Sequence, residues 1–233
     1  MLVLVFDTET TGLPKCKIMN QETLHLWPHI VQFSYIVYDT DLNAIVKTSD
    51  NIVKMPDGIS IPEEASKIHG ITNEISLSKG ISIQDVICEF FIDLMTVNLL
   101  VGHNVTFDLN ILKIELLRVI YTSDTQNMSK KDLKDFKKYF HFITNFKNIY
   151  CTLQESIEFC DIKTLDKYGK SYLKYPKLTE LHQKLFCSVP NNLHNSFNDV
   201  LVTLRCFMKL KFNTDVDDKC NMFKMIVNNL CVL

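Results

Sequence analysis

The sequence predicts a one-domain α/β protein, and two observations lead to that prediction. The first is bulk composition: 233 residues, 46% hydrophobic and 22% charged, with only six glycines and six prolines, match an ordinary globular domain with a full core. The second is the order of hydrophobic patterns. A short apolar run at 99–104 is followed at once, from 108 to 120, by a segment with an apolar helical face, which is typical of a parallel α/β unit.

The N-terminal part of the chain predicts a meander of three strands. Residues 2–6 form a short apolar run, and residues 30–38 and 44–54 are rich in β-branched and aromatic side chains. The turn-like sequence DTDLN at 39–43 separates the second run from the third, so we expect these runs to lie side by side in one sheet.

Helices and two further strands are predicted over most of the remaining chain. Pro62 and two glutamates begin a short segment that stops at Gly70, as expected for a helix. From Ser82, apolar residues recur at helical spacing as far as Leu94. The other predicted elements are strands at 99–104 and 148–151, a helix directly after the second of these strands, and helices at 108–120, 178–187, 196–210 and about 217–230.

Two lysine-rich segments depart from this alternation. Residues 122–147 predict a basic, partly helical insertion. Its lysines either form a solvated helix face or, with Phe136, Tyr139 and Phe140, hold a nucleic-acid strand. Residues 163–177 interleave lysines with tyrosines and predict a polar loop, with the lining of a substrate groove as the alternative. The largely apolar tail at 220–233 predicts either a final core helix or a contact surface.

Charge and cysteine content exclude several classes of protein. The formal net charge of −2 means that bulk electrostatics would not coat nucleic acid, so any such binding must be local. The eight cysteines form no CxxC pair and no zinc-module spacing, so we expect free thiols in a reducing, intracellular setting, in cytoplasm or nucleus. A bias toward Lys, Asn and Ile suggests an AT-rich coding genome and leaves a viral source open. The apolar runs are too short for a signal peptide or a membrane span, so we expect neither secretion nor membrane insertion.

Two acids stand where the first apolar run ends. In LVLVFDTETTGLP, at 2–14, Asp7 and Glu9 are one residue apart, and side chains at i and i+2 of a strand point to the same side. Two carboxylates at so short a distance repel each other, so either they lie in water or a cation sits between them. An isolated D-x-E at a strand end is more often a solvated turn.

Two further acids and one histidine stand in comparable places. Asp108 begins the helix after the fourth predicted strand, where α/β proteins place ligand-binding residues, although an aspartate there also serves as a helix cap. Asp199 lies on an apolar helix, where an unpaired carboxylate would be costly, and His194 precedes it by five residues, although an isolated H-x4-D is a weak signal.

The chemistry of these residues depends on whether they converge. Carboxylate oxygens without cysteine ligands select Mg²⁺ or Mn²⁺ over zinc. Two such ions roughly 3.5 to 4 Å apart can activate a water and stabilise the leaving oxygen of a phosphodiester. A histidine, which titrates near neutral pH, is suited to accept the proton of that water.

Taken in order, these segments resemble the DEDDh (DnaQ-like) family of 3′-to-5′ exonucleases. VFDTETTGLP at 5–14, LVGHNVTFDLNIL at 100–112 and HNSFNDVLVTL at 194–204 match its three motifs. Smaller landmarks agree: IVQFS at 30–34, IHGIT at 68–72 and CTLQES at 151–156, where the family often has aspartate instead of Cys151. The resemblance covers most of residues 1–210.

The resemblance implies a fold and a set of roles. The fold is an RNase H-like three-layer α/β/α domain with a five-stranded mixed sheet, spanning 1–233 as a single exonuclease domain. Four acids would hold two divalent ions, Mg²⁺ or Mn²⁺, with Asp7 bridging both: Asp7, Glu9, Asp108 and Asp199. His194 would be the general base. Residues that resemble substrate-binding positions are Thr10, Thr11 and Leu13 at the terminal nucleotide, His69 near the last bases and Asn104 in support of the site. For His69 and His103, a purely packed role is the alternative.

The implied activity is release of nucleoside 5′-monophosphates from single-stranded 3′ ends of DNA or RNA, for proofreading, repair or RNA trimming. A rival from another class is a nucleic-acid-binding or scaffold protein on the same fold that has lost catalysis, whose mark would be a missing acid or histidine. Another rival is a nuclease for short oligoribonucleotides. The sequence does not separate DNA from RNA, because contacts to the 2′-hydroxyl are local.

Overall fold

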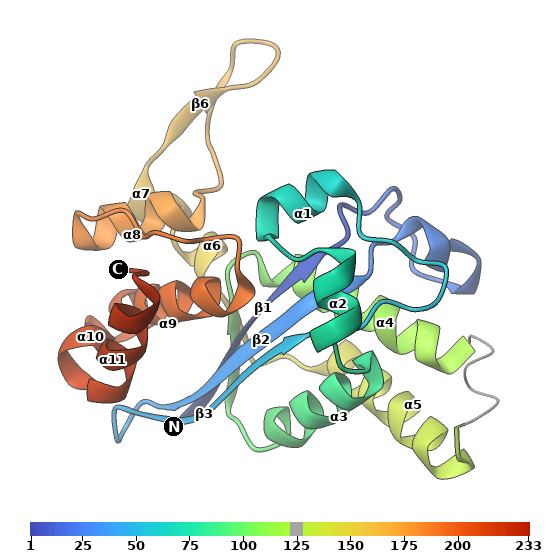
Figure 1. The fold of residues 1–233 in the computed structure, drawn as a ribbon. Coiled ribbons are helices and arrows are strands. Elements are labelled where there is room, and N and C mark those ends of the chain that lie inside the picture. The colour runs from blue at the N-terminus through green and yellow to red at the C-terminus, as the bar shows by residue number, and fades with distance from the viewer. Residues whose placement is uncertain (122–127) are drawn as a thin grey trace.

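A five-stranded mixed sheet forms the centre of the computed structural model, which describes residues 1–121 and 128–233 (Figure 1). The strand order is β3-β2-β1-β4-β5. β1 (Leu2–Thr10), β2 (Ile30–Asp39) and β3 (Ala44–Ile52) pair antiparallel, and β4 (Leu99–Gly102) and β5 (Ile149–Cys151) continue the sheet in parallel with β1. The predicted meander and its two parallel neighbours are therefore confirmed.

Helices cover both faces of this sheet, giving the expected three layers (Figure 1). On one face lie α3 (Ile83–Leu94), α4 (Val105–Tyr121) and α5 (Lys130–Asn145). On the other lie α8 (Leu178–Phe186), α9 (Ser196–Phe212), α10 (Val216–Lys219) and α11 (Asn221–Leu230). The smaller elements are η1 (Gln21–Leu26), α1 (Glu63–His69), α2 (Asn73–Lys79), α6 (Thr152–Glu155) and α7 (Ile157–Cys160).

Strand β1 is buried on both sides, and its alternation decides what each face receives. Leu4 and Phe6 pack into the core beneath α3, α4 and α5, whereas Val3 and Val5 pack into the core beneath α9 and α11. All four side chains are fully buried. The polar residues at the end of β1 continue the same alternation, so one set faces α9 and the other faces α4.

The described part of the predicted lysine-rich insertion is helix α5, and its aromatic side chains belong to the core. Phe136 is buried, and the ring of Tyr139 stacks on Phe91 with centroids 4.5 Å apart. Phe140 packs against the same cluster. The idea that these rings stack on bases is therefore wrong, because the amphipathic helix turns them inward and leaves its lysines in solvent. The first part of the insertion, residues 122–127, lies outside the described residues.

The expectation of an irregular loop at 163–177 is wrong. This segment contains a second, two-stranded sheet formed by β6 (Lys163–Leu165) and β7 (Ser171–Leu173). Its strands are too short for a visible alternation, and the turn is fixed by the Asp166 carboxylate, which accepts hydrogen bonds from the amides of Tyr168 and Lys170.

Smaller differences also have local causes. Helices η1 and α2 were not predicted, although the side chains of Asn20 and Thr72 cap their N-termini. The helix expected at about 217–230 is divided into α10 and α11. Phe223, Val227 and Val232 are buried, so the C-terminal tail is part of the core. All eight cysteines are free thiols, and no helix in the described ranges is long and apolar enough to cross a membrane.

Candidate active site

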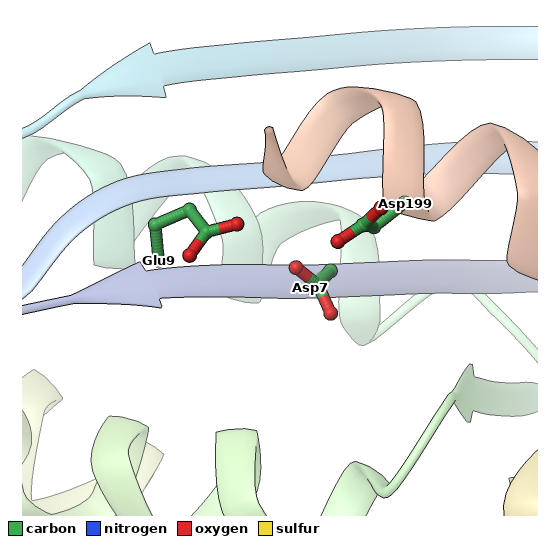
Figure 2. Close-up of side chains that lie close together, drawn as sticks. All are labelled: Asp7, Glu9 and Asp199. Carbon is green, nitrogen blue, oxygen red and sulfur yellow. The ribbon is translucent and has the colours of Figure 1, made fainter. Parts of the chain in front are cut away.

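Three of the predicted acids form a tight group at the end of β1. Oxygen atoms of Asp7, Glu9 and Asp199 all lie within 4.8 Å of one another. Asp7 and Glu9 point to the α9 side of the sheet, where Asp199 projects from the first turns of α9 (Figure 2). The strand's two-residue period thus brings the first pair together, and the helix packed above supplies the third acid.

Asp108 is the exception: it lines the same cleft but is not a member of that tight group. It lies in the first turn of α4, under the opposite face of the sheet, and is buried. Its Oδ1 accepts hydrogen bonds from the hydroxyl of Thr8 at 2.7 Å and from the amide of Thr8 at 3.1 Å. Thr8 points to the α4 side, so it fixes this carboxylate beside the three-acid group.

Burial raises the pKa of all four acids, and the charges of neighbouring acids add to this effect for Asp7, Glu9 and Asp108. Burial, followed by the negative charges of Asp108, Asp199 and Glu9, holds the pKa of Asp7 well above its ordinary value. Burial, with the charges of Asp199 and Asp108, raises the pKa of Glu9 to about 8. Burial raises the pKa of Asp108 and of Asp199 to about 7, although the hydrogen bonds from Thr8 act in the opposite direction on Asp108. The cluster therefore stores electrostatic repulsion that a cation would relieve.

The donor set fits a hard divalent cation. Every ligand atom offered by the three-acid group is a carboxylate oxygen, as Mg²⁺ and Mn²⁺ prefer. Oδ1 of Asp199 is buried and has no hydrogen-bond partner among the described residues. A buried carboxylate oxygen without a partner is costly, and a cation at this point would satisfy it.

His194 lies at the rim of the same cleft. It is exposed and adopts a left-handed backbone conformation, with φ of 66°, immediately before the Asn195 cap of α9. The side-chain oxygen of Asn195 accepts from the amides of Phe197 and Asn198, which fixes the start of the helix. The cap therefore holds His194 and Asp199 in one short, ordered segment.

Polar residues inside β2 tie the start of α9 to the sheet. The Gln32 side-chain carbonyl accepts from the amide of Ser196 at 3.1 Å, and the hydroxyls of Ser34 and Ser196 are 2.5 Å apart. Asp50 on β3 in turn accepts from Gln32 and Ser34, both at 2.8 Å. Sequence reasoning missed this anchor. Its signal was the presence of Gln and Ser in a strand predicted to be buried, where each must find a partner.

The acids line an open cleft of about 690 Å³. Its lining also includes Tyr175 and Lys177 from the segment before α8, which was expected to be a loop. Both side chains are exposed. The lining of the cleft thus combines the acids at the end of β1 with a cationic and an aromatic side chain from the segment before α8.

Most of the predicted substrate residues lie next to these acids. Thr10, Thr11, Leu13 and His69 line an adjoining cavity of about 530 Å³, which shares Glu9 with the cleft. Leu13 is 77% exposed, in a position open to a ligand.

The two threonine hydroxyls in this cavity serve the fold. Thr10 donates to the carbonyl of Gly12 at 2.7 Å, and Thr11 accepts from the amide of His29 at 2.9 Å. These bonds shape the turn after β1, so any contribution of these hydroxyls to a ligand competes with an existing hydrogen bond.

Three polar residues near the cleft differ in how many of their side-chain atoms are hydrogen-bonded. His69 accepts from the amide of Ile71 through Nδ1, and its buried Nε2 has no partner within the described chain. His103 is satisfied at both ring nitrogens, by Thr152 at 3.0 Å and the carbonyl of Pro176 at 3.1 Å, so the packed alternative describes it. Asn104 lines the cleft and is exposed.

Comparison with known proteins agrees with this geometry. Residues 4–207 match the RNase T exonuclease family. The DNA polymerase III subunit epsilon of Buchnera aphidicola subsp. Acyrthosiphon pisum (strain APS) is 34% identical over 114 residues, which are 48% of this chain and 44% of that protein. The chain therefore spans under half the length of this curated relative.

Solved structures support the fold. Escherichia coli Exonuclease I in complex with a dT13 oligonucleotide matches with a TM-score of 0.57 and 19% identity over 89% of this chain and 41% of that one. Exonuclease I from Methylocaldum szegediense matches with a TM-score of 0.60 and 16% identity, over 98% of this chain and 43% of that one. Because the family match covers most of the chain and the RNase H-like fold agrees, this protein belongs to the exonuclease family, in its DnaQ-like DEDDh group.

Proposed function

We propose that this protein is a 3′-to-5′ exonuclease that depends on Mg²⁺ or Mn²⁺ and acts on single-stranded 3′ ends of DNA or RNA. The observation that carries the proposal is the meeting of three carboxylates within 4.8 Å, with Asp108 fixed beside them in one open cleft. Asp7, Glu9, Asp108 and Asp199 would hold the divalent ions in this proposal.

The chain's own residues orient the reaction. Bound divalent ions supply positive charge that stabilises the developing charge on the phosphate and eases deprotonation of water. His194 accepts a proton from the attacking water, whose oxygen forms the new bond to phosphorus. The bond from phosphorus to the 3′ oxygen of the preceding nucleotide breaks, and that oxygen takes a proton from solvent to become the new 3′ hydroxyl. The products are a nucleoside 5′-monophosphate and a strand that is shorter by one residue.

The remaining residues position the 3′ end. Leu13 is exposed beside Glu9 and is suited to pack against the terminal base. His69 has a buried Nε2 without a partner in the described chain, which is suited to donate to a nucleotide oxygen. Asn104 is exposed in the same cleft and is suited to support the strand there.

The test is shortening of a 5′-labelled single strand in the presence of Mg²⁺ or Mn²⁺. We expect single-nucleotide steps with the natural chain, and loss of at least about 1,000-fold in rate with Asp7→Asn or with EDTA. Asp57→Asn, an exposed acid outside the cleft, is the matched control and should retain full activity. DNA, RNA and mismatched duplexes are compared side by side to identify the preferred substrate.

The same experiment distinguishes an active exonuclease from an inactive nucleic-acid-binding or scaffold protein on the same fold. If the natural chain binds labelled strands but releases no mononucleotide from any DNA or RNA with either metal, the enzymatic proposal fails. Release of mononucleotides only from very short RNA would favour the oligoribonucleotide nuclease.

A further inference from the structure

The β6–β7 hairpin carries a concentration of cationic and aromatic side chains that catalysis by the acid cluster does not use. The segment 161–177 contains five lysines and three tyrosines against only two aspartates, in a chain whose formal net charge is −2. Three of its rings are largely in solvent: Tyr168 is 82% exposed, Tyr172 50% and Tyr175 61%. The lysines are Lys163, Lys167, Lys170, Lys174 and Lys177.

The hairpin is an ordered projection. Figure 1 shows it extending away from the helices that surround its base. The amide of Gly169 donates to the carbonyl of Asp166 at 3.0 Å, and Gly169 has φ of +80°, which glycine adopts without strain. At the base, the amide of Lys174 donates to the carbonyl of Ile162 at 2.9 Å. With about 3.3 Å per residue, the arm reaches roughly 15 Å beyond that base.

The arm is continuous with the wall of the acidic cleft. Tyr175 and Lys177 lie two and four residues after the end of β7, and both line the cleft that holds the carboxylates. Between them, the carbonyl of Pro176 lies 3.1 Å from Nε2 of His103, which fixes this connection to the end of β4. A strand whose 3′ end lies at the acids therefore has a rigid, charged path from the cleft onto the hairpin.

Most of the charges on this path are available to a ligand. Among the described residues, Lys174 is the only one of the five lysines in an ion pair, with Glu180 at 2.6 Å. Lys167 lies 4.9 Å from the centre of the Tyr168 ring, so a cation and an aromatic face are presented together at the tip. Phosphates are bound by lysines and bases stack on aromatic rings, so this combination is typical of a surface that binds single strands.

Charge alone does not distinguish the hairpin, because α5 also has exposed lysines. The aromatic rings of α5 are turned into the core, and none of its residues lines the acidic cleft. Exposed rings, unpaired lysines and continuity with the cleft occur together on the hairpin. We propose that the β6–β7 hairpin binds the single strand several nucleotides upstream of its 3′ end and keeps long strands on the enzyme between cleavage steps. This inference rests on the proposed exonuclease function.

The experiment compares a long and a short substrate. Lys163→Glu, Lys167→Glu and Lys170→Glu are combined in one variant, which leaves the cleft-lining residues unchanged. The matched control reverses three exposed lysines of α5: Lys130, Lys134 and Lys137. Binding to a fluorescent 20-nucleotide strand in EDTA, nucleotides removed per encounter in the presence of a trap, and hydrolysis of a trinucleotide are measured for each protein. DNA and RNA strands are tested in parallel.

We expect the hairpin variant to bind the long strand at least tenfold more weakly and to release it after fewer steps. Trinucleotide hydrolysis should stay within about twofold of the natural chain, since so short a strand occupies only the cleft. A Lys-to-Gln triple variant should reduce the salt slope of binding by about 2, at about 0.7 per lost phosphate contact. Tyr168→Ala combined with Tyr172→Ala should weaken binding at least fivefold, because stacking on each base is lost.

The outcomes separate this inference from the activity itself. If hairpin and α5 variants bind and release the long strand equally, the hairpin is not a strand-binding arm, and a protein partner becomes its better explanation. If the natural chain hydrolyses no trinucleotide and no long strand, the exonuclease proposal fails instead. Circular dichroism and unfolding of each variant confirm that the compared proteins are folded.

Discussion

Replacing Asp199 by Asn should stabilise the metal-free protein at alkaline pH while removing its activity. Burial raises the pKa of all four acids, and the charge of Asp199 raises the pKa of Asp7, Glu9 and Asp108 further. The amide has nearly the same shape as the carboxylate but no charge. The variant therefore removes repulsion from the cluster and loses an oxygen suited to a cation, so stability and catalysis should change in opposite directions.

The magnitude follows from the pKa of Asp199, which burial raises from 3.8 to about 7. At about 1.36 kcal/mol per unit, ionising this group in the folded state costs at most about 4 kcal/mol. Water in the open cleft screens part of that cost, so we expect about 2 kcal/mol. For a chain of this length this corresponds to a rise in Tm of about 4 to 8 °C.

The dependence on pH has a definite sign. Below pH of about 4, Asp199 is protonated in both folded and unfolded chains, so the substitution has little effect. As pH rises from about 4 to 7, the unfolded chain loses its proton first and the natural protein loses stability. Above about 7 the penalty is complete, and the advantage of Asp199→Asn is largest.

Thermal unfolding at pH 4.5 and pH 8, with EDTA or with Mg²⁺, measures this effect. Mg²⁺ should raise the Tm of the natural protein at pH 8 and raise that of Asp199→Asn less, so the gap closes. Asp57→Asn, with an exposed carboxylate outside the cleft, controls for loss of one negative charge. A variant no more stable than the natural chain in EDTA at pH 8 would refute the argument that these acids repel one another in a buried cluster.

Two further substitutions test contacts outside the three-acid group. Thr8→Val removes the hydroxyl that holds Asp108, so the Mg²⁺ concentration for half-maximal activity should rise about tenfold, whereas Thr48→Val, on an exposed strand position, should leave it unchanged. Arg118→Met should lower the free energy of unfolding by about 3 to 5 kcal/mol in denaturant titrations, because it leaves the buried carboxylate of Glu115 without its 2.7 Å partner. Adding Glu115→Gln to that variant should recover part of the loss, and no recovery would contradict a charge-based explanation.

The sequence by itself determined the local geometry of β1 and the succession of strands and helices along the chain. The side-chain period of a strand is a local property, so Asp7 and Glu9 could be placed on one side of β1 without a structure. Asp7 and Glu9 were correctly expected on one side, and the strand–helix order correctly indicated parallel β4 and β5. Three ordered motifs then indicated the family.

Only the tertiary structure decided how the distant residues meet. Asp199 joins the pair on β1 because α9 packs on that face, anchored through Gln32. Asp108 stands apart from the tight group because it reaches the cleft from α4, under the other face, where Thr8 holds it.

The two lysine-rich segments also show that the sequence could not decide which side chains are buried. The aromatic rings of α5, which could have stacked on bases according to the sequence, pack toward the core, where Tyr139 stacks on Phe91 of α3. Residues 163–173, which were expected to form a loop, form a hairpin whose tyrosine rings are exposed to solvent. Composition was similar in the two segments, but burial depends on which surface each element packs against. Pairing between distant residues and packing of helices on a sheet are set by the whole chain, so no local pattern could supply them.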